Sequence, residues 1–147
     1  MSKTQAQSGF TTVEILITAA IISIFAMLAV TTYADYSQRA RVSSGVRLAA
    51  PVKLAVYEYF SSHGEFPDSN TAAGIAAPEE ISDRDIRSVT VGPMPTTGTI
   101  IVAFKARGSI ADGDSVLLVP LKYHNTVLWQ CTSRTLMKKL LPAACRE

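Results

Sequence analysis

Two cysteines near the C-terminus, Cys131 and Cys145, are the residues whose chemistry the sequence suggests first. The chain of 147 residues has no other cysteine, and its two histidines, His63 and His124, are not clustered with the pair. A metal site normally needs more ligands at close spacing, so the sequence predicts neither a metal nor a cofactor. A disulfide is the favoured interpretation, because the apolar N-terminal segment indicates export to an oxidising compartment. Two free thiols are the alternative.

The remaining reactive side chains form no recognisable catalytic pattern. Asp112-Gly113-Asp114 resembles part of a calcium loop, but it lacks the further spaced oxygens and the closing Glu, so we interpret it as a hairpin turn. Serine, histidine and aspartate residues are present, yet no nucleophile motif surrounds any of them, and no glycine pattern could cradle phosphate. The sequence therefore predicts a protein that is not an enzyme and has no catalytic residues.

The predicted disulfide loop is basic. Its positive side chains could contact DNA or an anionic cell surface, but a solvated face is the favoured interpretation. The formal net charge of the whole chain is only +2, which is too small to indicate nucleic acid or an anionic membrane as the main partner. The basic residues are Arg134, Lys138, Lys139 and Arg146.

Glu14 is the only charged residue in the apolar segment from Phe10 to Tyr33. As a helix rising about 1.5 Å per residue, this segment would be about 36 Å long and could cross a hydrocarbon core of about 30 Å. A carboxylate there costs about 2.5–3.5 kcal/mol on insertion scales, and such residues are usually functional. Two alternatives stay open. Glu14 could reach the headgroups by snorkelling, or it could lie in the first turn, where the helix dipole favours a carboxylate.

The residues around the start of this segment resemble a known export signal. The motif GFTTVE at residues 9–14 follows a short polar leader that contains Lys3, and it precedes the apolar run. This arrangement resembles the class III signal of type IV pilins and the related pseudopilins. The similarity continues at YADY (33–36), WQC (129–131) and LPAACR (141–146). The chain thus resembles the precursor of a type IVa major pilin.

The resemblance implies roles for three residues near the N-terminus. Gly9 would precede the cut made by a membrane prepilin peptidase. Phe10 would become the new N-terminus and be N-methylated by the same enzyme. Glu14 would pair with the Phe10 amine of a neighbouring subunit as the apolar helices pack in the filament. Such pairing would relieve much of the cost of burying a carboxylate and an ammonium, and it would fix the register between subunits.

The function implied by the resemblance is structural. The chain would polymerise with itself into a type IV pilus, a helical homopolymer used for adhesion, twitching motility and DNA uptake. It would reside in the bacterial inner membrane before the pilus assembly machinery adds it to the extracellular pilus, where a host surface or DNA would be a partner. The alternatives are a minor pilin or a type II secretion pseudopilin, and an enzyme anchored by an uncleaved helix, for which no catalytic constellation is found.

An amphipathic stretch follows the apolar segment. Its apolar residues recur at steps of three and four, which is typical of one buried stripe of a helix that packs on a sheet. Pro51 falls within the pattern and is expected to bend the helix rather than end it, because the stripe continues beyond it. Gly64 suits a left-handed cap, so the helix is expected to end near His63. The stripe consists of Val42, Val46, Ala49, Val52, Val56 and Tyr59 or Phe60.

Short strands are predicted in the second half of the chain, after a surface connection at residues 65–87. Turn residues separate the strand-like runs, and short strands with short connections predict an antiparallel meander. Pro120 cannot donate a ladder bond, so it is expected at a sheet edge or a bulge. The runs are residues 88–91, 99–105, 115–121 and 126–131.

Together these elements predict an α+β fold. A long N-terminal α-helix, in a lollipop arrangement, would pack on a small antiparallel β-sheet that ends in a C-terminal disulfide loop. The expected organisation is a leader at 1–9, a helix at 10–63 and a globular head at 64–147. The helix would comprise a transmembrane and filament-core part at 10–33 and an amphipathic part at 34–63, and the head would include the loop 131–145.

Overall fold

The computed structural model describes residues 9–124 and 126–146. The predicted leader therefore lies outside the described residues, apart from Gly9. The chain divides into two units, residues 1–34 and 35–147. The division falls within the long helix α1 (Thr12–Leu48), close to the end of the apolar segment.

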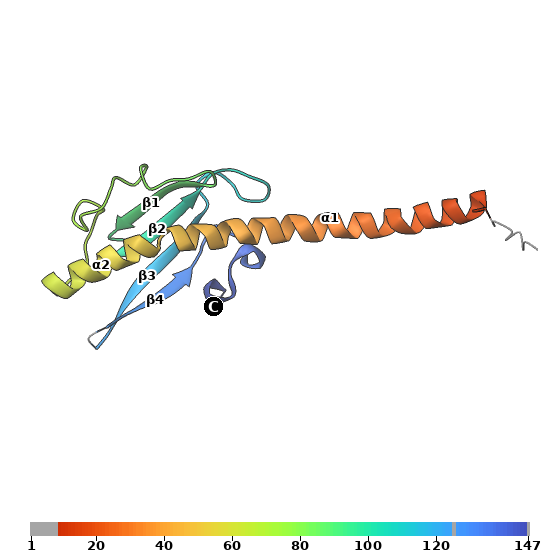
Figure 1. Cartoon of the computed structure of the whole chain (residues 1–147). Coiled ribbons are helices and arrows are strands. Elements are labelled where there is room, and N and C mark those ends of the chain that lie inside the picture. The colour runs from red at the N-terminus through yellow and green to blue at the C-terminus, as the bar shows by residue number, and fades with distance from the viewer. Residues whose placement is uncertain (1–8, 125, 147) are drawn as a thin grey trace, which may run out of the picture. The chain divides into compact units, whose positions relative to one another are not determined.

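The apolar segment of the first unit is helical, as the sequence predicts (Figure 1). Hydroxyl groups in this part of α1 donate back to carbonyl oxygens four residues earlier: Thr18 to Glu14 at 2.7 Å and Ser23 to Ala19 at 2.8 Å. These polar side chains are thus satisfied within the helix, which is the condition that a lipid environment imposes.

Helix α2 (Ala50–His63) continues the helical path after a one-residue interruption at Ala49. Backbone bonds bridge the interruption, from Ala49 N–H to the Gly45 carbonyl at 3.2 Å and from Lys53 N–H to the Ala49 carbonyl at 2.9 Å. Pro51 sits in the first turn of α2, where its missing N–H is tolerated, so the helical path carries on past it as predicted. Gly64 caps the end at φ 77°, which confirms the left-handed cap.

The sheet has four strands in the order β1-β2-β3-β4, and every neighbouring pair is antiparallel, so the predicted meander is confirmed. Strand β1 begins before the predicted run, and its register with β2 shifts between Ile86 and Ser88. Such an irregularity allows one extra residue and a local bend. The strands are β1 (Ile86–Gly92), β2 (Thr99–Phe104), β3 (Ser115–Tyr123) and β4 (Thr126–Thr132).

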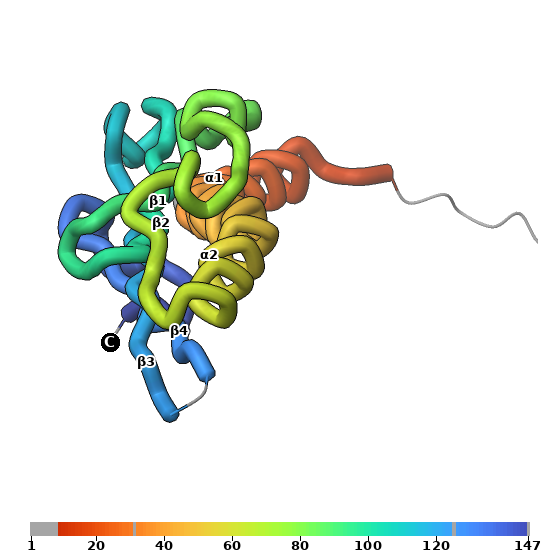
Figure 2. Tube along the Cα trace, turned by 90° about the vertical axis from the view of Figure 1, so that its left-hand side faces the viewer, coloured from red at the N-terminus to blue at the C-terminus, as the bar shows by residue number. Residues whose placement is uncertain are grey.

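The core of the second unit lies between the helices and one face of this sheet. Figures 1 and 2 both show α2 lying along that face. The predicted apolar stripe is buried apart from Val46, which is half-buried, and Phe60 rather than Tyr59 completes it. Large buried side chains of the sheet face the stripe, and those under 2% exposed include Ile86, Val89, Ile100, Val102, Phe104, Val116 and Leu118.

Pro120 occupies a position where the side of β3 towards β2 has no ladder. The pairing of β2 with β3 ends at Ile100 and Leu118, whereas the pairing of β3 with β4 continues through Pro120 and Trp129 to Tyr123 and Thr126. The missing N–H of Pro120 therefore leaves no gap in the sheet. The expected edge position is confirmed, because β3 outruns its neighbour on that side.

The connection between α2 and β1 is fastened by one buried side chain. Asn70 is 4% exposed, and its amide nitrogen donates to the carbonyls of Ala76 (2.9 Å) and Val89 (3.1 Å). Its carbonyl oxygen accepts from Val91 N–H at 2.6 Å. Asn70 thus meets the outer backbone groups of β1, and the connection covers that edge of the sheet.

Candidate functional site

The predicted cleavage junction lies at an exposed end of the described chain. Gly9 and Phe10 precede α1 and have no regular secondary structure. The Phe10 side chain is 83% exposed, and no atom outside the neighbouring residues lies within 4 Å of a Cβ built on Gly9. The peptide bond between these residues is therefore accessible in the first unit.

Glu14 and Thr11 form a reciprocal hydrogen-bonded cap at the start of α1. The Thr11 backbone N–H donates to Glu14 Oε2 at 2.9 Å, and the Thr11 hydroxyl donates to the same oxygen at 2.7 Å. In return, the Glu14 N–H donates to Thr11 Oγ1 at 3.3 Å. This is a capping box, in which a Thr and a Glu three residues later satisfy each other's backbone donors.

The capping box gives Glu14 donors within its own chain. The carboxylate is therefore hydrogen-bonded before any neighbouring subunit approaches, and its place in the first turn agrees with the helix-dipole interpretation. Thr11 is a residue that sequence reasoning missed, although the Thr-x-x-Glu spacing of a capping box was present in the motif.

The side chains that follow Glu14 expose a continuous apolar surface. Large residues such as Leu16, Phe25 and Met27 are 69%, 67% and 76% exposed. The helical run Thr12–His63 is the one in the described residues that is long and apolar enough to cross a membrane. A surface of this size marks a contact with lipid or with other protein chains.

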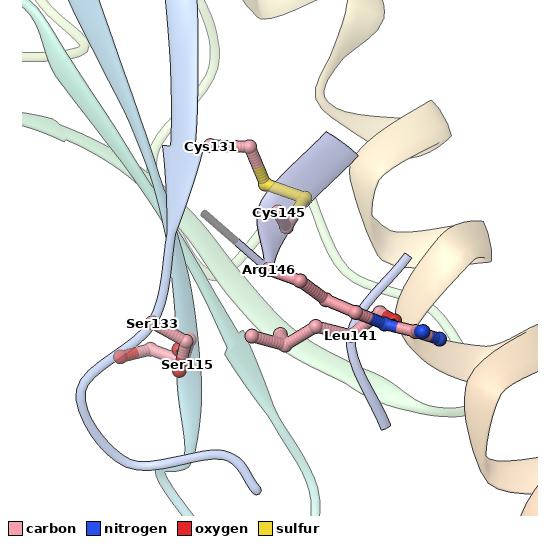
Figure 3. Close-up of a disulfide and its surroundings, with 6 residues drawn as sticks. All are labelled: Ser115, Cys131, Ser133, Leu141, Cys145 and Arg146. Atoms are coloured by element: carbon pink, nitrogen blue, oxygen red, sulfur yellow. Dashed lines mark hydrogen bonds between the residues drawn. A yellow bond between two sulfur atoms is a disulfide. The ribbon is translucent and has the colours of Figure 1, made fainter. Parts of the chain in front are cut away.

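The predicted disulfide is present between Cys131 in β4 and Cys145 in the short helix η2 (Ala143–Cys145). Figure 3 shows the bond between the strand and this helix. Cys145 is 3% exposed, and it belongs to the core of the second unit together with Leu141. The link therefore fastens the C-terminal segment to the last strand, as expected from the sequence.

Polar contacts also tie the disulfide loop to α1. Arg39 Nε donates to the Lys139 carbonyl at 2.5 Å, and Lys139 Nζ lies 3.1 Å from an Asp35 carboxylate oxygen. Arg146 Nε donates to the Leu141 carbonyl at 2.8 Å. Two of the four predicted basic residues thus hold the loop in place. The other two, Arg134 and Lys138, are exposed and make no ion pair within the described residues.

The Asp112-Gly113-Asp114 segment is a turn, as predicted. Gly113 has φ 85°, and its N–H donates to the Phe104 carbonyl at 3.0 Å. Asp114 Oδ2 accepts from Ala111 N–H at 2.8 Å, and Asp112 pairs with Arg87. In the described part of the chain, no three His, Cys, Asp or Glu side chains are grouped to hold a metal ion.

An exposed apolar helix joined to a disulfide-closed α+β unit is an arrangement suited to polymerisation. A family model described as pilin (bacterial filament) matches residues 38–146, which is more than half of the chain. The chain therefore belongs to the pilin family, whose members are structural subunits of extracellular pili and not enzymes.

Individual pilins are similar over most of the chain. The fimbrial protein EcpC of Eikenella corrodens is 37% identical over 97% of this chain and 93% of its own length. The type IV major pilin protein PilE1 of Neisseria gonorrhoeae is 32% identical over 96% of this chain and 94% of its own length. A fimbrial protein of Neisseria meningitidis serogroup B is 36% identical over 85% of this chain. The resemblance to type IV pilins is thus confirmed.

Proposed function

We propose that this chain is the main subunit of a type IV pilus, made with a leader that a prepilin peptidase removes between Gly9 and Phe10. The exposed apolar part of α1, directly after this junction, carries the proposal. Side chains so exposed require lipid or the apolar helices of neighbouring subunits. The relatives named as major pilin and fimbrial proteins support the main-subunit role over a minor pilin or a type II secretion pseudopilin.

The apolar part of α1 accounts for both proposed locations of the subunit. Residues 10–33 hold the subunit in the bacterial inner membrane before assembly, and they pack in the core of the extracellular pilus afterwards. The pilus assembly machinery moves the subunit from one to the other. In both places the helix stays in apolar surroundings, so the transfer exchanges lipid contacts for protein contacts rather than exposing the helix to water.

Phe10 and Glu14 act together in this proposal. Cleavage makes Phe10 the N-terminus, the peptidase N-methylates it, and the amine pairs with Glu14 of a neighbouring subunit. The exposed Glu14 carboxylate at the start of α1 supports the pairing, because only its Thr11 donors occupy it within the described residues. An ammonium and a carboxylate that meet in the filament core also penalise a wrong stagger between subunits.

Intact-mass analysis of sheared surface filaments tests the processing. The expected mass lacks residues 1–9, carries one added methyl group and lacks two hydrogens for the disulfide. Abundant chain in these filaments would support the main subunit, whereas a trace amount would indicate a minor pilin. Material that begins at Met1 would contradict the cleavage, the methylation and the pairing together.

The pilus would serve adhesion to host surfaces, twitching motility and DNA uptake. The exposed Arg134 and Lys138 support an electrostatic contribution to DNA contact. Filaments carrying Arg134→Gln and Lys138→Gln are then expected to retain less DNA than wild type, and wild-type retention is expected to fall steeply with salt. Arg84→Gln is the matched control, since Arg84 is exposed outside the loop. Retention that is independent of salt would remove the DNA role.

A further inference from the structure

The two edges of the sheet differ in how their backbone groups are satisfied. At the β1 edge, the N–H of Val89 donates to the Pro78 carbonyl at 3.1 Å, and Asn70 meets Val89 and Val91. The connection before β1 therefore closes this edge against a further strand. Strand β4 forms the opposite edge.

The direction of the β4 backbone groups follows from the bonds of β3. The Phe104 N–H donates to the Asp114 carbonyl at 2.8 Å, so the Asp114 carbonyl points towards β2. The backbone groups of the even-numbered residues of β3, which follow Asp114, then also point towards β2. Ser115 N–H donates instead to Thr135 Oγ1, on the β4 side. Bonding sides alternate along a strand. The backbone N–H and C=O groups of the odd-numbered residues of β3 therefore point towards β4.

The partners in β4 alternate in the same way. Leu128 and Gln130 lie opposite the odd-numbered residues Leu121 and Val119, so their backbone groups bond to β3. The N–H and C=O groups of Val127 and Trp129 consequently point away from the sheet. Within residues 9–124 and 126–146, no other backbone or side-chain group bonds to them.

The disulfide fastens η2 beside the Cys131 end of β4. The part of the β4 edge before Cys131 lacks the usual features that prevent strand pairing. The β4 sequence, TVLWQCT, contains no charged residue and no proline, and no ionisable residue occurs between His124 and Arg134. Edge strands that avoid association normally carry charges, prolines or bulges, or are covered. Leu128, in the middle of β4, is 51% exposed, and its cross-strand neighbour Leu121 is 45% exposed.

We propose that the β4 edge pairs antiparallel with the β4 edge of a second copy in a neighbouring filament, so that pili associate laterally. The inference rests on the proposed assembly into pili. With the two-fold axis at Leu128, Val127 of one copy exchanges hydrogen bonds with Trp129 of the other. Leu128 then lies opposite Leu128 of the second copy in a non-hydrogen-bonded pair, where side chains approach most closely.

A second copy fits this edge better than an unrelated chain. Antiparallel pairing of two identical strands is self-complementary, and β4 itself carries no charge that would face its copy. A filament also repeats the same edge many times along its length. Two filaments lying side by side can therefore add many weak contacts, and the combined attachment exceeds the strength of one pair.

Matched lysine variants test the edge. Leu128→Lys places a charge at the proposed two-fold axis, and Leu121→Lys places the same charge on the same face, one strand inward. Sheared filaments are counted by electron microscopy as single or bundled. Wild type and Leu121→Lys are expected to bundle, and Leu128→Lys is expected to give single filaments in undiminished amount.

Four other results would contradict one of the two proposals. Bundles that persist in Leu128→Lys, or an equal loss in both variants, would overturn the edge pairing. Wild-type filaments that never bundle would overturn it as well, while leaving the pilus assembly intact. Absence of wild-type filaments would contradict the proposed function itself.

A cross-link gives an independent measurement. Leu128→Cys places two thiols opposite each other at the two-fold axis, whereas Leu121→Cys does not. Unlabelled and ¹⁵N-labelled filaments are sheared, mixed and mildly oxidised, and the cross-linked peptides are weighed. A mixed-label dimer through residue 128 but not through residue 121 is expected. Cross-links that join only subunits of one label would place the contact within a filament and overturn the lateral pairing.

Discussion

At the scale of single residues, Glu14 is the one charge in an apolar run, and a capping box holds it at the start of α1. Both the backbone N–H and the hydroxyl of Thr11 donate to its carboxylate. The carboxylate is thus held at the helix start independently of any pairing between subunits.

The contribution of Thr11 to the start of α1 can be measured in the subunit dissolved in detergent. Thr11→Ala removes the acceptor of the Glu14 N–H, and loss of such a cap costs about 1 kcal/mol. Amides of the first turn are expected to exchange hydrogen faster in detergent micelles, while the middle of α1 is unchanged. Thr12→Ala is the matched control, one position further on. Equal exchange in the two variants would contradict the cap.

Lys53 offers a second residue-scale test, through pH. Burial lowers the pKa of the Lys53 ammonium, which lies 5.5 Å from the centre of the Trp129 ring. The unfolded chain, with an ordinary lysine pKa of about 10.4, then binds more protons than the folded chain at pH values between the lowered and the ordinary pKa. The free energy of unfolding contributed by Lys53 therefore rises with pH through that window.

The measurement compares wild type with Lys53→Met by denaturant unfolding at a series of alkaline pH values. Wild type is expected to gain stability relative to Lys53→Met as the pH approaches about 10.4, because the cost of burying the charge disappears when the amine is neutral. Lys138→Met, which changes an exposed lysine, serves as the control. A stability difference that stays flat with pH would contradict the burial effect.

At the scale of elements, the spacing of apolar residues predicted the buried side of the helix, and the turn residues predicted where the strands lie. All of the stripe from Val42 to Phe60 except the half-buried Val46 is buried, because its spacing places it on one side of the helix. The four strands follow the runs between turn residues. Asn70 could not be predicted in its role. The Asn70 side chain bonds to the Val89 carbonyl and the Val91 N–H, and these groups come close to Asn70 only when the chain has folded.

Gly45 is another residue whose role depends on tertiary contact. A Cβ built there would lie 2.8 Å from Cε1 and Cζ of Phe104 and 3.2 Å from Cγ1 of Val102. Helix α1 therefore approaches the sheet more closely than a side chain at this position would allow. No periodic pattern marks such a position, because glycine contributes nothing to an apolar stripe.

Gly45→Ala is expected to destabilise the second unit. Alanine favours a helix over glycine by about 1 kcal/mol, but overpacking a core costs about 1–3 kcal/mol, and the buried Phe104 ring has little room to move. Denaturant unfolding measures the net effect. The smaller Leu side chain of Phe104→Leu should make room for the added methyl group. Gly45→Ala should therefore lower the free energy of unfolding less in the Phe104→Leu background than in wild type. A more stable Gly45→Ala variant would show that the ring yields easily.

At the scale of the whole molecule, the two units present different surfaces. Residues 10–33 expose apolar side chains that water does not favour, whereas the second unit encloses a core closed by a disulfide. Assembly can bury the first surface without reorganising the second. In the proposed filament, the helices would then supply the attraction between subunits, and Glu14 would supply the register.

Glu14→Gln separates the charge of this residue from its cap. Glutamine also completes a capping box with Thr11, so the start of α1 is expected to stay intact. The proposed partner, the Phe10 amine, would instead be left as an unpaired charge in the filament core, and removing one partner of a buried pair costs about 3–5 kcal/mol.

The Glu14→Gln variant should therefore accumulate as processed subunit in the membrane and be missing from sheared filaments, as measured by immunoblot of both fractions. Thr11→Ala keeps the charge and should still assemble. Filaments from Glu14→Gln but not from Thr11→Ala would mean that the cap, and not the ion pair, controls assembly.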